Sequence, residues 1–116
     1  EYDIMEESLK KILECWDLDT TWGWDFAMMA MTATRLGKPE LAIELLLMDT
    51  PNNHYVISGH NAQTKREDLY LPGNGSLLLA VAMMTAGFSG CDSDLPGFPK
   101  DGSFIVEYEN IKPFPY

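Results

Sequence analysis

Two tryptophans and one aspartate crowd the start of an apolar segment of the chain. Residues 20–42 read "TTWGWDFAMMAMTATRLGKPELA", in which Trp22 and Trp24 bracket a glycine and Asp25 precedes nine uncharged residues. Indole rings stack on sugar rings, and a lone carboxylate beside them can act as a general base. We therefore predict that Trp22 and Trp24 bind a carbohydrate substrate and that Asp25 is catalytic. The structural alternative is that the indoles pack a core and that Asp25 complements the dipole of a helix.

A long polar segment, residues 49–75, carries side chains suited to binding sugar hydroxyls. Amide and imidazole groups offer both hydrogen-bond donors and acceptors, and loops of this length are uncommon unless they serve function. The predicted substrate-binding residues in this segment are Asn53, His54, His60, Asn61, Gln63 and Asn74. Hydrogen bonding within the loop is their alternative role. The two histidines lack partners in a recognisable metal-binding pattern, so we predict no metal site and no cofactor.

Apolar periodicity predicts four helices that would position these groups. They cover residues 3–16, 22–36, 38–48 and 76–86. Asp3 and Glu6 are spaced as a capping pair for the first helix, and Pro39 suits the start of the third. Gly37 and Gly87 are expected to end the second and the fourth.

A short strand is predicted near the C-terminus, where Phe104, Val106 and Tyr108 alternate with their neighbours over residues 104–109. We divide the chain into a helical part, residues 1–90, and a loop-and-strand part, residues 91–116. The fold class is therefore mainly α with one short β-strand.

The order of the helices predicts where a site would lie. A short link makes the second and third helices an antiparallel hairpin, so the chain returns to the Trp22 end before the polar segment begins. If that segment stays there, the fourth helix starts at the same end, near Gly73. Two helix amino ends would then share one face with the indoles, and free N–H groups there favour anions or hydroxyl oxygens.

Composition and charge narrow the classes of partner. Of the 116 residues, 46% are apolar, and the net charge is −10. An acidic chain is repelled by nucleic-acid phosphates and by anionic membrane surfaces, so we expect neither partner. The helices 22–36 and 76–86 are apolar nearly all round, and a four-helix domain cannot cover them. We expect the missing wall to come from the remainder of a larger helical assembly or from a homo-oligomeric partner.

The residues quoted above, followed by "GHN" and "LYLPGNGSLLLAVAMMTAG", resemble the C-terminal hairpins of six-hairpin glycosidases. The resemblance covers roughly residues 15–110. It points to the glycoside hydrolase family 65 group, which includes maltose and trehalose phosphorylases, acid trehalases and glucosylgalactosyl-hydroxylysine glucosidase-like proteins. It implies the last hairpins of an (α/α)6 barrel, with residues after 91 leading toward a C-terminal β-sandwich.

The resemblance also carries expectations about activity. It implies an inverting glycoside hydrolase that cleaves an α-linked glucoside, with an oligosaccharide or glycoside as partner. The general acid of the family lies in an earlier hairpin, so this chain would be inactive by itself. Thr20 and Thr21 stand where the phosphorylases have a phosphate-binding serine pair, which favours hydrolysis. Pro72 replaces an aspartate that related fucosidases carry before Gly-Asn. A disaccharide phosphorylase fragment and a non-catalytic helical binding or assembly module are the alternatives.

Overall fold

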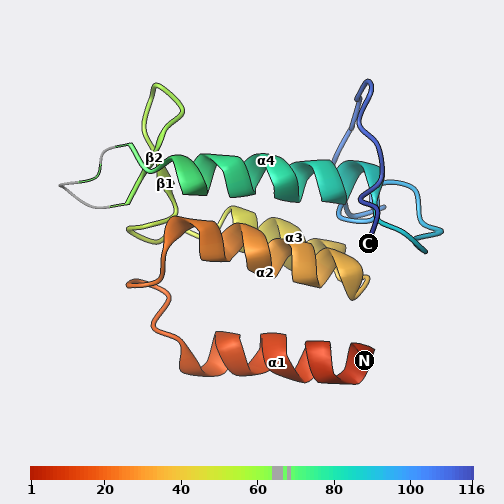
Figure 1. Ribbon diagram of the computed structural model, residues 1–116, viewed down its shortest axis with the longest axis horizontal. Helices are drawn as coiled ribbons and strands as arrows, with labels where there is room; N and C mark the ends of the chain where they lie inside the picture. The colour runs from red at the N-terminus through yellow and green to blue at the C-terminus, as the bar shows by residue number, and fades with distance from the viewer. Residues whose placement is uncertain (64–66, 68) are drawn as a thin grey trace.

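The computed structural model describes residues 1–63, 67 and 69–116, and its architecture is mainly helical (Figure 1). Its helices are α1 (Tyr2–Cys15), α2 (Gly23–Arg35), α3 (Pro39–Leu46) and α4 (Leu71–Ala86). Two short antiparallel strands, β1 (His54–Tyr55) and β2 (Asn61–Ala62), lie between α3 and α4. The predicted mainly-α class is confirmed. Within the described ranges, no helix is both long and apolar enough to cross a bilayer.

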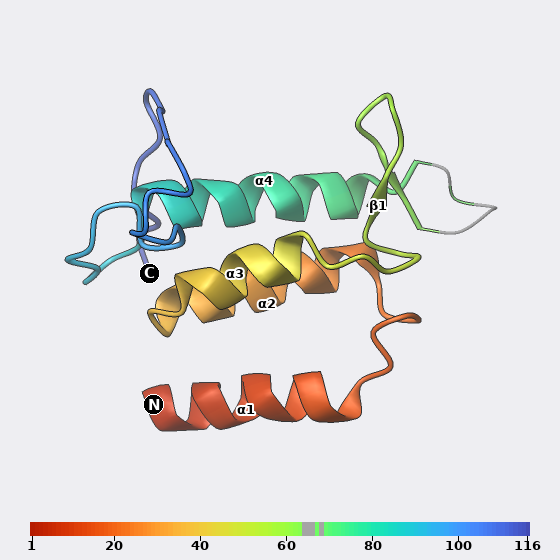
Figure 2. The ribbon, with the colours of Figure 1, turned by 180° about the vertical axis from the view of Figure 1, so that it is seen from behind.

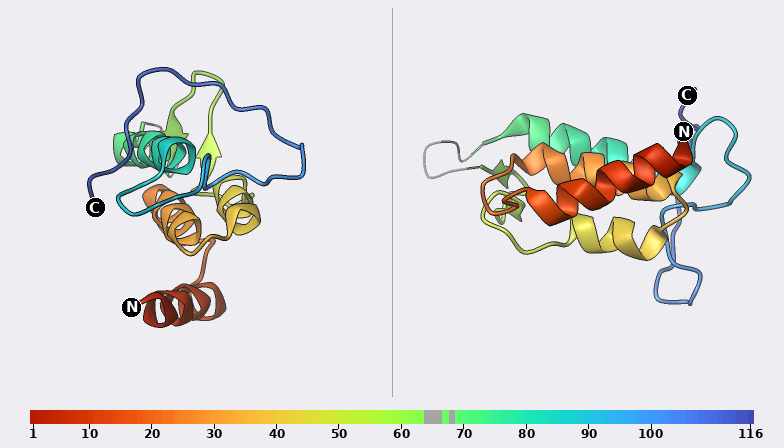
Figure 3. Two further views of the ribbon diagram at one scale, coloured as in Figure 1. Left: turned by 90° about the vertical axis from the view of Figure 1, so that its right-hand side faces the viewer. Right: turned by 90° about the horizontal axis from the view of Figure 1, so that it is seen from below.

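Helix α2 lies at the centre of the arrangement. Helices α1 and α3 run antiparallel to it, whereas α4 runs parallel to it, so α2 and α4 begin at the same end (Figures 1 and 2). The end-on view shows α4 and α3 on two sides of α2 and α1 on a third (Figure 3). The antiparallel hairpin predicted for α2 and α3 is therefore present.

The core forms around α2 because this helix is apolar on several sides. Phe26, Met29, Ala30 and Ala33 are fully buried and pack with residues of α1, α3 and α4. Gly37, with φ 68°, ends the helix as predicted. The N–H groups of Gly37 and of the next residue donate to carbonyls of the last turn, which satisfies groups that a helix end leaves free.

Helix α4 begins at Leu71, five residues before the predicted start. The prediction treated the proline and glycines that follow as a turn. Pro72 lies in the first turn of the helix. Backbone N–H groups in a first turn have no partner within the helix, so the N–H that proline lacks is not needed there. Gly87, with φ 80°, ends the helix as expected.

One side of α4 is apolar and exposed. Leu71, Leu78, Leu79 and Val81 make up this α4 apolar face, and Leu78 is 72% exposed. The helix carries no ionisable side chain. Single exposed leucines are ordinary, but three leucines and a valine on one helix leave a larger apolar surface in water.

Helix α1 is attached by few groups. Leu9 is its buried residue, and Glu6 forms an ion pair with Lys38 at 2.6 Å. A hydrogen bond from Lys38, together with its charge, holds the pKa of Glu6 below its ordinary value. The predicted cap by Asp3 was wrong: the helix starts one residue earlier, at Tyr2, and no side chain caps it.

The predicted strand over residues 104–109 is not formed, because no segment among the described residues pairs with it in a ladder of hydrogen bonds. The C-terminal segment instead folds back over the end of α4 (Figures 1 and 3). An isolated parallel bridge joins Phe88 to Phe114. Arg35 fixes the tail, since its guanidinium donates to the carbonyl of Tyr116 at 2.6 Å and lies 4.6 Å from the centre of the Phe88 ring.

Candidate functional site

The amino ends of α2 and α4 meet at one end of the molecule, beside the β1–β2 hairpin (Figure 1). Trp22 and Tyr70 are the residues that immediately precede the two helices. Their rings lie with centroids 5.5 Å apart and an interplanar angle of 34°. The predicted meeting of the Trp22 end, the polar segment and the start of the fourth helix is therefore present.

We use the name aromatic face for three aromatic side chains at this end: Trp22 and Tyr70, whose rings are in contact, and Trp24 in the first turn of α2. The two indoles are 49% and 43% exposed, so both remain open to a ligand. Burial raises the pKa of the Tyr70 hydroxyl, and the negative charges of Glu67 and Asp25 add to the effect. The Tyr70 hydroxyl is thus a neutral group at physiological pH, able to donate or accept a hydrogen bond.

Asp25 lies in the first turn of α2 and is only 7% exposed. Its Oδ2 accepts a hydrogen bond from the N–H of Trp22 at 2.9 Å. A carboxylate in this position satisfies a free N–H of the helix start and interacts favourably with the helix dipole. The structure therefore gives Asp25 a local role in the helix start, and its charge acts on the Tyr70 hydroxyl.

Asn61 is fully buried between the two helix ends. Its Nδ2 donates to the carbonyls of Asn52 and His54 at 3.1 and 3.0 Å. Its Oδ1 has no hydrogen-bond partner among the described residues. It lies so close to Gly23 and Gly73 that a methyl group added at either glycine would overlap it.

Gln63 and Asn74 complete the hydrogen bonds at this end. Gln63 is buried, and its Oε1 accepts the N–H of Gly23 at 2.7 Å. The Oδ1 of Asn74 accepts the N–H of Asn61 at 2.9 Å, and its Nδ2 donates to Gly59. These amides join the polar segment to both helices, which is the alternative role that the sequence left open for them.

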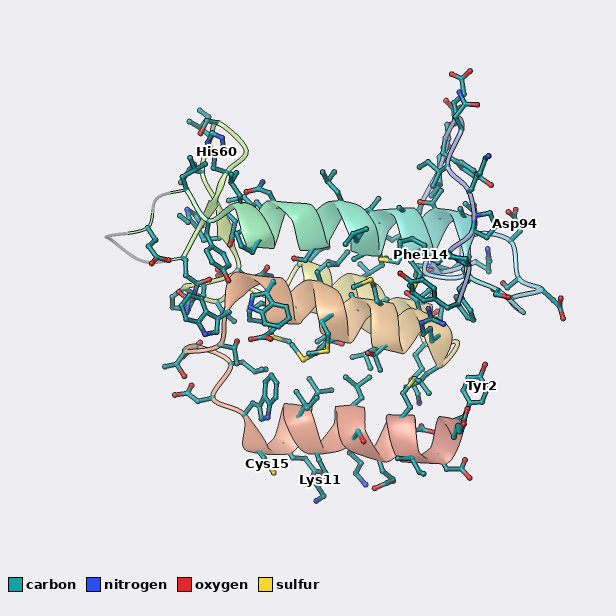
Figure 4. The ribbon with its side chains drawn as sticks, in the orientation of Figure 1. Tyr2, Lys11, Cys15, His60, Asp94 and Phe114 are labelled. Carbon is teal, nitrogen blue, oxygen red and sulfur yellow. The ribbon has the colours of Figure 1, made fainter. Side chains whose placement is uncertain are left out.

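The three remaining predicted residues make other contacts. Asn53 donates to the carbonyls of Leu46 and Met48 at the end of α3. His54 is exposed on β1. His60 lies in the loop between β1 and β2, on the side of α4 that is opposite α2 (Figure 4). Its Nδ1 is 3.0 Å from Ser58 Oγ.

Tyr70 is the main residue of the site that the sequence analysis missed. The predicted helix began at Ser76, which left Tyr70 inside the polar segment with no assigned place. A tyrosine followed by Leu-Pro is the signal that could have found it, because proline favours the first turn of a helix. Asn52, another amide of the polar segment, donates to the carbonyl of Thr21 at 2.8 Å, just before α2.

This end of the molecule presents aromatic rings on a rigid, hydrogen-bonded base. Such a surface suits a ligand that has both apolar ring faces and hydroxyl groups. Within the described part of the chain, no three His, Cys, Asp or Glu side chains are grouped to hold a metal ion. Comparison of the chain with family models, with curated proteins and with solved structures gave no match.

Proposed function

We propose that this chain is the carbohydrate-facing, C-terminal helical part of a glycoside hydrolase that acts on an α-linked glucoside. The observation that carries the proposal is the aromatic face. The rings of Trp22 and Tyr70 are in contact at the parallel amino ends of α2 and α4, and the half-exposed indole of Trp24 lies in the first turn of α2. Aromatic rings bury large areas at low cost in flexibility, and hydroxyl-bearing ligands also need the polar groups that surround them.

The helix arrangement supports the barrel part of the proposal. Inner helices of an (α/α) barrel run parallel to one another and antiparallel to the outer ones. Here α2 and α4 are parallel neighbours, and α3 is antiparallel and covers another side of α2 (Figures 2 and 3). We assign α2 and α4 to the inner ring and α3 to the outer ring.

The α4 apolar face supports a larger assembly. Leu71 and Leu78 are more than half exposed, and burial of a leucine is worth about 1.5–3 kcal/mol. Further hairpins of the barrel would cover this face. A homo-oligomeric partner is the other candidate for the missing wall.

Hydrolysis is favoured over phosphorolysis by the hydrogen bonds at the start of α2. The N–H groups of Trp22 and Gly23 already donate to side chains of this chain. The hydroxyls of Thr20 and Thr21 donate to backbone carbonyls at 3.1 Å each. A phosphate would need these donors, and the Asp25 carboxylate beside them would repel it.

In this proposal Asp25 is the general base of an inverting reaction, and a glutamate from an earlier hairpin is the acid. Inversion requires two carboxyl groups separated by roughly 6.5–9.5 Å, with room for a water molecule. Because the proposed acid belongs to an earlier hairpin, this chain alone would bind sugar without cleaving it. A non-catalytic binding module is the second candidate function, and the hydrogen bond from Trp22 N–H to Asp25 favours it.

Titration of the chain with maltose and with trehalose, followed by tryptophan fluorescence, tests the proposal. We expect saturable binding, weakened at least tenfold, or about 1.4 kcal/mol, by Trp22→Ala or Trp24→Ala. Tyr2→Ala is the matched control, because Tyr2 is exposed at the opposite end of the molecule (Figure 4). Absence of saturable binding, or an equal loss in the control, would reject the aromatic face as a sugar site.

A second measurement separates the two candidate functions. A longer protein that contains this chain and the earlier hairpins should release glucose from an α-glucoside. If that protein binds the sugar with the same dependence on Trp22 but releases none, the binding module is the correct reading.

A further inference from the structure

We propose that Asn61 is a positioning residue that fixes the amino ends of α2 and α4 against each other and so sets the spacing of the Trp22 and Tyr70 rings. The geometric half of this inference stands on the contacts of Asn61 alone. The functional half, that this spacing serves sugar binding, rests on the function proposed above.

The backbone of Asn61 is bonded directly to the start of α4. Its carbonyl accepts the N–H of Tyr70 at 2.8 Å, and its N–H donates to Asn74 Oδ1 at 2.9 Å. Tyr70 precedes the helix and Asn74 lies in its first turns. The position of the tyrosine ring therefore follows the position of Asn61.

The side chain of Asn61 connects the same point to α2. Gly23 is the first residue of α2 and follows Trp22, and Gly73 lies three residues after Tyr70. The Asn61 amide fills the space between these two glycines, and only hydrogen atoms there leave room for it. The Asn61 amide group thus sets how closely Gly23 of α2 and Gly73 of α4 can approach each other.

The contact of Asn61 Oδ1 with Gly23 and Gly73 forms although this oxygen accepts no hydrogen bond from the described residues. A buried polar atom without a hydrogen bond costs about 1–3 kcal/mol, and such atoms are rare. Among the residues that the structure describes, Asn61 Oδ1 is such an atom. Its partial negative charge lies between two helix amino ends, whose dipoles are positive, and this offsets part of the loss. An apolar side chain would fill the space without attracting both helices.

Asn61→Ala tests the inference when it is compared with Asn53→Ala in the same chain. Asn53 is an amide of the same segment whose side chain, among the described residues, donates to carbonyls at the end of α3, so Asn53→Ala should lower stability without removing a contact to either ring. We expect Asn61→Ala to lose most of the near-ultraviolet circular dichroism of the aromatic pair and the nuclear Overhauser contacts between the Trp22 and Tyr70 rings. The control keeps both, and both variants keep their far-ultraviolet helix signal.

Maltose affinity is then measured on the same samples. Asn61→Ala should weaken it at least tenfold, and Asn53→Ala by less than twofold. Unchanged ring contacts in Asn61→Ala would overturn the positioning role. Lost ring contacts with unchanged maltose affinity would overturn the link to binding. Failure of the proposed function itself is recognised separately, since the unmodified chain would then not bind maltose.

A rescue experiment covers the case in which Asn61→Ala does not fold. Gly73→Ala should disturb the ring contacts as Asn61→Ala does, because the added methyl displaces the amide. The double variant Asn61→Gly with Gly73→Ala removes that overlap and should recover part of the stability lost in Gly73→Ala. Additive losses in the double variant would show that the two residues are not coupled, against the inference.

Discussion

Trp22 and Tyr70 hold equivalent places in the fold: each immediately precedes a helix, the two helices are parallel, and the two rings are in contact. Residues 48 positions apart in the sequence are thereby joined into one surface. The contact depends on how the two helix starts are held against each other, and Asn61 of the polar segment bonds one of them. Substitutions at these starts and at Asn61 should therefore affect the aromatic face more than substitutions elsewhere in the polar segment.

Substitutions at Asp25 separate its structural role from a catalytic one. Asp25→Ala removes the acceptor for the Trp22 N–H and should lower the free energy of unfolding by about 1 kcal/mol. Asp25→Asn keeps an oxygen that can accept this bond and should cost less. Both values come from urea unfolding of the chain.

The catalytic role of Asp25 requires a longer, active protein. There Asp25→Asn should reduce turnover by about two to four orders of magnitude if the carboxylate is the base, because an amide cannot take the proton. A reduction of less than tenfold, with stability retained, would leave Asp25 as a helix-start residue only.

Two glycines of α4 should respond in opposite directions to the same substitution. Gly73→Ala places a methyl against Asn61 and should destabilise the chain by about 1–3 kcal/mol. Gly75→Ala meets no atom within contact distance in the described structure and should stabilise the helix by about 0.5–1 kcal/mol. Thermal unfolding of the two variants checks this. Equal effects would mean that Asn61 moves freely away from Gly73.

The attachment of α1 should depend on Leu9. Leu9 is 3% exposed and is the buried residue of this helix, so Leu9→Ala should cost about 2–5 kcal/mol. Ile4, on the same helix and 73% exposed, provides the control, and Ile4→Ala should change stability little. Limited proteolysis would follow α1 directly, with cleavage near residues 16–21 accelerated only in Leu9→Ala.

Alkaline titration should detect two tyrosines, Tyr55 and Tyr70, that ionise at a higher pH than free tyrosine. Burial raises the pKa of Tyr55, and burial with two nearby carboxylates raises that of Tyr70. The unfolded chain, in which tyrosine ionises near pH 10, then binds fewer protons than the folded chain above that pH. Stability should therefore fall as the pH rises beyond about 10. Absorbance at alkaline pH should show a late component that is reduced in Tyr70→Phe and in Tyr55→Phe; a titration identical to that of free tyrosine would contradict the burial of both.

The helical part of the fold could be predicted because its signals are local. Apolar spacing located α2, and Gly37 and Gly87 marked helix ends through their positive φ angles. The start of α4 was predicted five residues late because a Pro-Gly-Asn-Gly sequence is typical of turns as well as of a first helical turn. The prediction of a strand over residues 104–109 was wrong for a different reason, since alternation of apolar and polar residues does not provide a partner strand.

The candidate site was predictable in its location but not in its internal bonds. Helix order was enough to bring the Trp22 end and the polar segment together. Whether Gln63 or Asn61 faces solvent or the protein depends on backbone groups that become adjacent only after folding, here Gly23 N–H and the carbonyls of Asn52 and His54. The residue type alone does not identify the partner, because an amide side chain can donate to and accept from a sugar hydroxyl and a peptide group alike.

The α4 apolar face has a practical consequence for anyone preparing this chain. Because the helix bears no ionisable group, changing the pH cannot place a charge on its exposed leucines. Sulfate or phosphate buffers would make these leucines adhere more strongly to one another. A mild detergent, or Leu78→Lys on this face, should keep the purified material dispersed while leaving the indoles at the amino end of α2 unaltered.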